Sequence, residues 1–218
     1  MTIETRRLGI LDYQEALDLQ AALVEERRRG EIPDLLLLLQ HSPVITLGVK
    51  TRHTRTNIVA TDAQLADSGV AVFETGRGGD VTYHGPGQLV GYPIFDLNPG
   101  RRDVHRYVRD IEQALIDAVA TFGIAAGRVE GLTGIWVGND KLAAIGVRIS
   151  RWITSHGFAL NVSTDLSHFD LIVPCGIEGR GVTSMDRLLG RPVSMAEVET
   201  AVEAAFLAHF ARLPEPRE

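Results

Sequence analysis

The chain has 218 residues, 44% of them hydrophobic, and carries a formal net charge of −6 at pH 7. Length and composition predict one or two globular domains; no Pro-, Gly- or Ser-rich linker divides the chain, so we expect a single domain over residues 1–218. The acidic balance disfavours general nucleic-acid binding, which needs a basic surface.

Cysteine usage and hydropathy indicate the cellular compartment. The one cysteine, Cys175, can form neither an internal disulfide nor a cysteine-based zinc site, and this fits a reducing cytosol. The first ten residues lack the apolar core of a signal peptide. The longest aliphatic run, Leu35–Leu39, is too short to span a membrane. We therefore expect a cytoplasmic protein with neither nucleic acid nor membrane as a partner.

Hydrophobic periodicity predicts the elements of the first half. Apolar residues at helical spacing from Tyr13 predict a first helix that Gly30 ends. Short apolar runs then predict buried strands. The elements predicted after the first helix are strands at Asp34–Gln40 and Val44–Leu47, a helix at Asp62–Ser68 and a strand at Val70–Phe73.

The second half contains several consecutive strands. Its predicted elements are a strand at Gln88–Leu97, an amphipathic helix over Val104–Phe122, strands at Gly134–Val137, Lys141–Ile149 and Ser155–Val162, an Asn139–Asp140 turn, and a last helix capped by Ser194 with Glu197. Because strands follow one another directly while helices interleave, we predict an α/β (α+β) fold. It would contain a mixed, largely antiparallel sheet with packed helices.

A glycine-rich stretch, Gly76–Gly91, is the most informative segment. It reads GRGGDVTYHGPGQLVG and has six glycines among polar and cationic side chains. Glycine permits positive φ and close approach of a ligand or another backbone. We interpret the stretch as an internal loop shaped around a ligand.

Two further residues are candidates for chemistry. Cys175 lies in Pro174–Ile177, outside the periodic segments. Its thiolate would be a strong nucleophile if a cation or base activated it, whereas a lone cysteine can also be a small buried hydrophobe. Lys141 opens an apolar strand. Its ammonium either reaches water, or lowers a thiol pKa, or serves as a base. His84 and His156 each adjoin a glycine and are either structural or site residues.

Several common sites are excluded by their motifs. The sequence contains no GxxxxGK[ST] phosphate loop, no GxGxxG after a strand, no HExxH and no GxSxG. The seven histidines lack close metal-ligand spacing. We predict neither a metal nor a cofactor.

Taken together, these segments resemble the octanoyltransferases of lipoate biosynthesis, the lipoyl(octanoyl) transferase family of lipoate-protein ligase B type. Arg77–Gln88 resembles the family signature RGG-x-x-T-[FY]-HG-x-GQ, and Lys141–Gly146 resembles K-[IL]-A-x-I-G. Trp152–Val162 contains a segment similar to HG-x-ALN, and Pro174–Ile177 falls where the family carries its acyl-accepting cysteine. The four ordered motifs extend the resemblance over nearly the whole chain.

The resemblance implies an activity and a fold. A transferase of this family moves an octanoyl group from octanoyl-acyl carrier protein to one lysine of a lipoyl carrier domain. Acceptors are the lipoyl domains of 2-oxoacid dehydrogenases and the glycine cleavage H protein, and the step is the first in endogenous protein lipoylation. The family fold is similar to the catalytic domains of biotin and lipoate protein ligases.

The resemblance also implies the site. Cys175 would carry the acyl group as a thioester, and Lys141 would activate it, either by stabilising the thiolate or as a general acid or base. Backbone N–H groups of the glycine-rich stretch, or those around Cys175 and Gly176, would hold the oxyanion. The implied substrate-binding residues are Arg77, Gly78, Gly79, Asp80, Val81, Thr82, Tyr83 and His84, then Ala144, Ile145 and Gly146, then Gly157, Phe158 and Ala159.

Other functions remain open on the sequence alone. The alternatives are an ATP-dependent lipoate or biotin protein ligase, a non-catalytic module that binds carrier domains, and a cysteine hydrolase. Two basic clusters are either solvated faces or docking patches for an acidic partner. They are Lys50, Arg52 and Arg55, and Arg101, Arg102 and Arg106.

Overall fold

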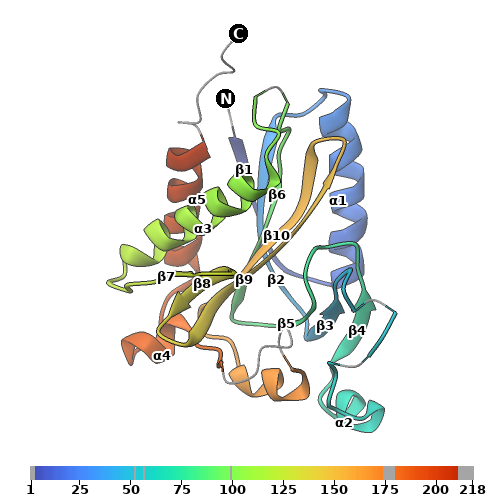
Figure 1. Ribbon diagram of the computed structural model, residues 1–218, viewed down its shortest axis with the longest axis vertical. Helices are drawn as coiled ribbons and strands as arrows, with labels where there is room; N and C mark the ends of the chain where they lie inside the picture. Colours follow the sequence, from blue (N-terminus) through green and yellow to red (C-terminus); the bar gives the residue numbers. More distant parts are fainter. Residues whose placement is uncertain (1–2, 52, 56, 99, 174–179, 211–218) are drawn as a thin grey trace.

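Two β-sheets organise the molecule (Figure 1). The computed structural model describes residues 3–51, 53–55, 57–98, 100–173 and 180–210. The main sheet has the strand order β1 (Ile3–Leu11), β2 (Asp34–His41), β6 (Gln88–Ile94), β10 (Ile153–Asn161), β9 (Asp140–Ser150), β8 (Leu132–Val137) and β7 (Gly127–Val129). The smaller sheet has the order β4 (Ala71–Glu74), β3 (Val44–Leu47) and β5 (Val81–His84).

Strand pairing confirms the predicted fold class. In the main sheet β1 and β2 are parallel, and the other neighbouring strands are antiparallel. In the smaller sheet β3 runs parallel to β4 and antiparallel to β5. Both sheets are therefore mixed, and the main sheet is largely antiparallel.

The helices are α1 (Tyr13–Arg28), α2 (Asp62–Asp67), α3 (Val104–Ala120), the 3₁₀ helix η1 (Leu166–Leu171), α4 (Met185–Leu189) and α5 (Met195–Phe210). The helices α3 and α5 pack on one face of the main sheet and α1 packs on the other (Figure 1). The helices α2 and η1 contribute instead to the core of the smaller sheet. Because side chains alternate along a strand, Leu36 and Leu38 join the α3–α5 core while Leu35, Leu37 and Leu39 join the α1 core. The leucine run is thus a strand buried on both faces.

Three sequence predictions need correction. The glycine-rich stretch is not one loop: Val81–His84 form β5, because Val81 and Tyr83 point into the core of the smaller sheet. The hairpin turn is Gly138–Asn139 rather than Asn139–Asp140, since Val137 pairs with Asp140 and Gly138 adopts a φ of 59°. The strand from Gln88 ends at Ile94, not at Leu97.

The first strand, β1, was not predicted. It lies at the edge of the main sheet, and four consecutive polar residues interrupt its apolar ones, so it shows no apolar run. Backbone pairing with β2 holds it in place. The predicted cap of the last helix is present: Ser194 precedes α5, and its Oγ accepts a hydrogen bond of 3.5 Å from the Glu197 backbone.

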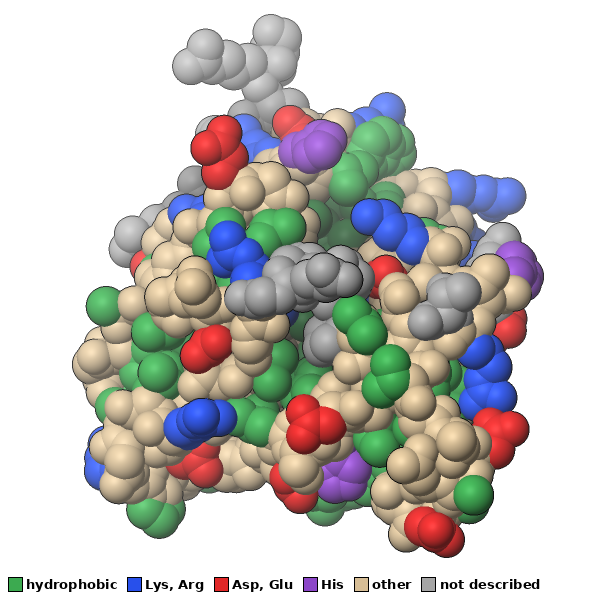
Figure 2. Space-filling model, turned by 60° about the horizontal axis from the view of Figure 1, so that its bottom comes forward, with side chains coloured by type: hydrophobic (Ala, Val, Ile, Leu, Met, Phe, Trp, Pro, Cys, Tyr) green, Lys and Arg blue, Asp and Glu red, His purple; other side chains and the backbone are tan. Residues whose placement is uncertain are grey.

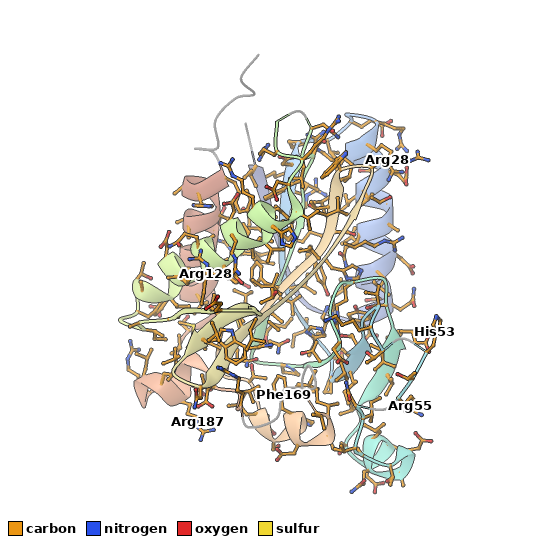
Figure 3. All side chains as sticks on the ribbon, in the orientation of Figure 1. Arg28, His53, Arg55, Arg128, Phe169 and Arg187 are labelled. Carbon is orange, nitrogen blue, oxygen red and sulfur yellow. The ribbon has the colours of Figure 1, made fainter. Side chains whose placement is uncertain are left out.

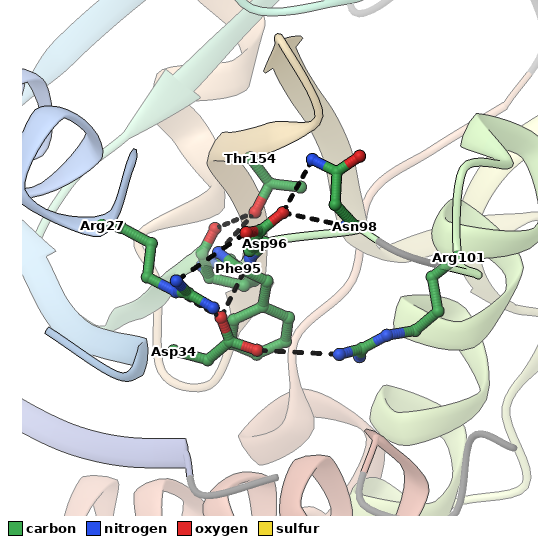
Figure 4. A network of polar contacts seen from close by, with 8 residues as sticks. Arg27, Asp34, Phe95, Asp96, Asn98, Arg101 and Thr154 are labelled. Atoms are coloured by element: carbon green, nitrogen blue, oxygen red, sulfur yellow. Dashed lines mark hydrogen bonds and ion pairs between the residues drawn. The ribbon is translucent and has the colours of Figure 1, made fainter. Parts of the chain in front are cut away.

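A buried polar network fixes the end of β6 where the chain turns toward α3 (Figure 4). Asp34 is 2% exposed, and its Oδ1 accepts a hydrogen bond of 2.8 Å from Arg27 Nε and one of 2.9 Å from the Asp96 backbone N–H. Arg101 Nη2 lies 3.8 Å from the other oxygen of Asp34. One carboxylate therefore joins α1, β2 and the segment that leads into α3.

A second buried carboxylate ties α3 to the β7–β8 hairpin. Glu112 is fully buried, and Arg109 and Arg128 donate to its Oε2 at 2.6 and 2.9 Å; Arg128 lies beside α3 in Figure 3. Its Oε1 accepts the Gly134 backbone N–H at 3.0 Å. The hairpin that positions Trp136 and, through pairing, Lys141 is thereby attached to the helix.

Across the described part of the chain, no helix combines the length and apolar character needed to cross a membrane.

We predict that Asp34→Ala destabilises the protein by about 3 kcal/mol, because the change leaves Arg27 and the Asp96 N–H without their shared buried acceptor. Urea unfolding measures the free energy. The control, Glu25→Ala, removes the exposed Arg28–Glu25 pair and should change stability little. Equal effects of the two substitutions would contradict the role given to Asp34.

Candidate active site

A cavity of about 490 Å³ lies between β9, β10 and the glycine-rich segment. This volume is within the range of small-molecule sites. Figure 2 shows hydrophobic side chains around a recess on this side of the molecule, with Lys or Arg side chains at its rim. Its lining includes Tyr13, Lys50, Arg77, Gly78, Gly79, Asp80, Val81, Thr82, His84, Tyr92, Val104, Val108, Lys141, Ala144, Ile145, Gly146, His156, Gly157, Phe158 and Ala159.

Small residues form the floor of the cavity. On two neighbouring strands Ala144 pairs with Ala159, and Gly146 pairs with Gly157. Paired residues of antiparallel strands face the same side, so these four positions form one patch that bulky side chains do not fill. Space for a ligand is therefore built into the register of β9 and β10.

The glycine-rich segment forms the opposite wall. The Gly78 N–H donates to Val147 O at 2.9 Å. A Cβ at Gly146 would lie only 2.7 Å from Gly78 O, so glycine is required where the two backbones meet. This contact joins the segment to the edge of β9.

Arg77 holds the segment on the smaller sheet. Its guanidinium is buried and donates to the backbone oxygen of Thr46 at 2.6 Å and to Thr46 Oγ1 at 2.8 and 3.1 Å. It also donates to Gly78 O at 3.1 Å. Arg77 thus places a fixed positive charge in the cavity wall and fixes the shape of the segment.

Tyr83 lies apart from the other predicted substrate-binding residues. On β5 the side chains of Thr82 and His84 face the cavity, whereas Tyr83 faces the opposite side. Its ring stacks on His168 at a centroid distance of 4.8 Å and meets Phe169 at 5.6 Å. Side chains alternate between the two faces of a strand, so Tyr83 points away from the cavity that Thr82 and His84 face. This alternation is not expected when the segment is interpreted as a loop.

Lys141 lies at the start of β9 and lines the cavity. Its Nζ is 4.8 Å from the Trp136 ring centroid, a cation–π distance. Its backbone pairs with the segment after residue 179: Lys141 N donates to Gly181 O at 2.9 Å and Thr183 N donates to Lys141 O at 3.0 Å. The predicted nucleophile, Cys175, lies outside the described residues.

Buried tyrosines and histidines form the inner wall of the cavity and the layer behind it, and the sequence did not identify three of them. Tyr13 and Tyr92 line the cavity, whereas His41 is buried and packs against both of their rings. His41 Nε2 and Tyr92 Oη lie 2.7 Å apart, and His41 Nδ1 lies 2.8 Å from Leu11 O. Each residue sits in or beside an apolar element, so only the folded arrangement shows that they meet.

Burial keeps these histidines neutral. It lowers the pKa of His41 to about 4 and that of His156 to about 4, and for His156 the charges of Arg77 and Arg148 lower it further. The pKa of His84 is well below its usual value through burial and the nearby His41 and Arg77. Burial also raises the pKa of Tyr13 to about 12, although Arg77 opposes this rise. The inner wall is polar but carries little charge beyond Arg77 at neutral pH.

The predicted basic clusters are partly used inside the molecule. Arg101 joins the Asp34 network, and the Arg102 guanidinium lies 5.9 Å from the Trp152 ring centroid. Arg55 pairs with Asp62 at 2.9 Å on the outer side of the smaller sheet (Figure 3). Lys50 alone of these lines the cavity among the residues that the structure describes. The cluster that contains Lys50 is therefore the better candidate of the two for docking an acidic partner.

Sequence comparison relates the chain to known enzymes. Residues 12–207 match the family model of the lipoyl protein ligase A/B catalytic domain. An octanoyltransferase of Myxococcus xanthus is 56% identical over 215 residues, which cover 96% of this chain and 60% of that protein. An octanoyltransferase of Solibacter usitatus is 56% identical over 208 residues, covering 95% of this chain and 91% of the relative. The chain thus spans less than two thirds of the Myxococcus protein and most of the Solibacter protein.

Structural comparison confirms the predicted likeness to lipoate and biotin ligases. A bipartite lipoate protein ligase from Thermoplasma acidophilum, described with its E2 lipoyl domain, aligns with a TM-score of 0.73 at 17% identity, over 100% of this chain and 87% of that chain. Biotin protein ligase from Aquifex aeolicus aligns with a TM-score of 0.57 at 10% identity, over 95% and 70%. Identities this low show a shared fold only.

We predict that acid destabilises the protein partly through His41. The neutral form is favoured in the folded state and the unfolded pKa is near 6.5, so His41 contributes stability above about pH 6.5 that is lost as the pH falls toward about 4. In His41→Gln the slope of unfolding free energy against pH, between pH 4 and 6.5, should be shallower by about 1.4 kcal/mol per pH unit. Denaturant titrations over this range measure it, and an unchanged slope would contradict the assignment.

Proposed function

The chain belongs to the octanoyltransferase family of acyltransferases, built on the lipoyl protein ligase A/B catalytic domain, and we propose that it transfers an octanoyl group from octanoyl-acyl carrier protein to a specific lysine of a lipoyl carrier domain. The observation that carries this proposal is the cavity itself. A floor of small residues faces a glycine backbone, and Lys141 lies in the same cavity. An extended apolar chain fits such a slot.

The proposed reaction uses a thioester intermediate. The Cys175 thiolate attacks the carbonyl carbon of the octanoyl thioester, the carbon–sulfur bond to the carrier breaks, and the carrier leaves as a thiolate that takes a proton from the Lys141 ammonium. The amine of the acceptor lysine then attacks acyl-Cys175, loses a proton to the Lys141 amine and forms an amide, while the carbon–sulfur bond breaks and releases the Cys175 thiolate. Exchange between thioesters is nearly balanced and aminolysis is downhill, so the cysteine divides one transfer into two accessible steps.

Lys141 is proposed to activate this chemistry. As an ammonium it stabilises the thiolate; as an amine it accepts a proton from the attacking lysine. Pairing of its backbone with Gly181 and Thr183 supports the role, because these residues closely follow Cys175 in sequence. Backbone N–H groups of the glycine-rich segment are candidates for holding the oxyanion.

The substrate-binding residues are proposed from the cavity lining. Gly78–Thr82 form one wall of the proposed acyl site, and Arg77 and His84 hold that wall in position. The opposite wall consists of Ala144, Gly146, Gly157 and Ala159. We do not propose Tyr83 as a substrate contact, because its ring stacks on His168 on the side of β5 away from the cavity.

The proposed acceptors are lipoyl domains of 2-oxoacid dehydrogenases and the glycine cleavage H protein, which places the reaction first in protein lipoylation in the cytoplasm. The lipoyl domain named with the Thermoplasma ligase supports this class of acceptor. An ATP-dependent ligase is the nearest rival, since it shares the fold. The octanoyltransferase relatives, at 56% identity, favour the transferase.

We predict that the wild-type protein, mixed with octanoyl-acyl carrier protein in the absence of ATP, gains the mass of one octanoyl group on Cys175. Peptide mapping by mass spectrometry locates the adduct, and Cys175→Ser should not form it. Addition of a lipoyl domain should remove the adduct and acylate the domain. An absolute requirement for ATP would instead identify a ligase, and release of free octanoate without an acceptor would identify a hydrolase.

We predict that Lys141→Ala slows formation of the acyl-enzyme at pH 7 by roughly 10²-fold or more with the fold intact, because the thiolate loses its activating group. Rapid-quench mass spectrometry measures the rate, and circular dichroism checks the fold. Lys141→Arg is the matched control: it keeps the charge but not the titratable amine, so its partial rescue would favour thiolate stabilisation. A wild-type rate in Lys141→Ala would refute the activating role.

A further inference from the structure

Lys141 faces the cavity because β9 contains a β-bulge. Ile135 of β8 pairs with Ala143 of β9, and the next residue of β8, Trp136, pairs with Lys141. Leu142 is therefore an extra residue on β9, and both Leu142 and Ala143 belong to the α3–α5 core although they are neighbours on one strand. Without the bulge, regular alternation would turn Lys141 to the same face as Ala143. The bulge instead places Lys141 on the cavity side, opposite Trp136.

The indole ring of Trp136 contacts the Lys141 side chain. Lys141 Nζ lies 4.8 Å from the ring centroid, and Trp136 is only 3% exposed. Tryptophan is the best aromatic partner for a cation, and the attraction grows when the pair is removed from water. Gly134, also on β8, lies beside the stem of the lysine, since a Cβ there would be 3.7 Å from Lys141 Cε. β8 therefore leaves room for the stem of Lys141 and offers an aromatic face to its ammonium.

The same ring contacts a second cation, Arg180. Its guanidinium carbon lies 5.2 Å from the Trp136 ring centroid. Arg180 stands five residues after Cys175 in the sequence, and shortly beyond it Val182 forms a parallel bridge with Lys141. One side chain of β8 thus contacts both the proposed activating lysine and the segment that follows the proposed nucleophile.

We propose that Trp136 is a positioning residue for the acyl transfer, and that its ring holds the Lys141 ammonium in place together with Arg180. The inference rests on the proposed function, because Trp136 acts through Lys141 and has no chemistry of its own. A lysine ammonium sits on a flexible four-carbon stem and occupies many positions unless a partner attracts it. The ring face limits these positions, and activation of a nucleophile depends on such placement. A tryptophan that only filled space would affect stability, but its effect on the rate would not depend on Lys141.

Two replacements separate the aromatic face of Trp136 from its buried volume. Trp136→Leu and Trp136→Phe both remove part of the indole, and only phenylalanine keeps an aromatic face. Among the residues that the structure describes, no acceptor pairs with the indole N–H, so neither replacement breaks a hydrogen bond within this part of the chain. At saturating octanoyl-acyl carrier protein, we expect Trp136→Leu to slow acyl-enzyme formation roughly 10-fold and Trp136→Phe to slow it less than about 3-fold.

Rapid-quench mass spectrometry measures these rates, and circular dichroism checks the fold. The donor concentration that gives half the maximal rate should stay unchanged, because Trp136 acts on Lys141 and not on donor binding. Equal slowing by the two replacements would contradict the inference.

A double-mutant cycle tests whether Trp136 acts through Lys141. Trp136→Leu should slow the wild type roughly 10-fold but slow Lys141→Ala less than about 2-fold, because the group that the ring holds is then absent. The same loss in both backgrounds would leave Trp136 with a structural role only and overturn the inference. The matched control is Trp152→Leu: the Arg102 guanidinium lies 5.9 Å from that ring, and the pair is outside the described lining of the cavity. This control should keep the wild-type rate.

Fluorescence tests the contact without any reaction. The chain contains two tryptophans, so Trp152→Phe leaves Trp136 as the only one. In that background Lys141→Met, which keeps a long unbranched side chain and removes the charge, should change the emission intensity of Trp136. An unchanged spectrum would overturn the inference, even if Trp136→Leu does not fold.

The outcomes separate this inference from the proposed function. If the wild type forms the acyl-enzyme and Trp136→Leu forms it at the same rate, the inference alone is overturned. If the wild type forms no acyl-enzyme, the proposed function is overturned, and the role given to Trp136 fails with it.

Discussion

The close approach of two backbones, Gly78 to β9, is the constraint on which the site depends. The Gly78 N–H reaches Val147 O at 2.9 Å, and Gly146 has no Cβ to keep Gly78 O away. β8 pairs with β9 only as far as Ala143, so beyond that residue the edge of β9 is available to the glycine-rich segment. This contact joins the smaller sheet to the main sheet. Because the residues at the junction are small, side chains do not fill the space between the two sheets, and a cavity remains.

Arg77 is the buried charge of the cavity wall, while Lys50, Asp80 and Lys141 also line the cavity. Arg77 is held by Thr46 and Gly78 through hydrogen bonds to oxygen atoms. Burial, together with the charge of Arg77, lowers the pKa values of His84 and His156 and so disfavours further cations beside Arg77. The floor that an acyl chain would meet consists of Ala144, Gly146, Gly157 and Ala159. Lys141 provides a second charge at the other end of the strand.

The sequence predicted the main sheet and the long helices because their apolar patterns are strong. It did not predict β1, whose edge position leaves polar side chains on both faces. Three of the four ordered motifs contain residues that line the cavity, including Ala144 and Ala159, whose pairing only the register shows. Tyr83 was predicted with the other residues of its segment, and its position on the far side of β5 could not be predicted while the segment was taken as a loop. His41 and Tyr92 carried no local signal, since their meeting depends on strands brought together by the fold.

The cavity combines a slot of small residues with a lysine at one end of that slot. We expect the acyl chain to lie between the glycine-rich segment and the floor of β9 and β10. A crystal structure of the protein after reaction with an octanoyl thioester would locate this chain. It should run from the acylated residue beside Lys141 across Ala144 and Gly146, with its methyl end toward His156. A chain that instead lies along α3, against Val104 and Val108, would show that the small-residue floor is not the acyl site.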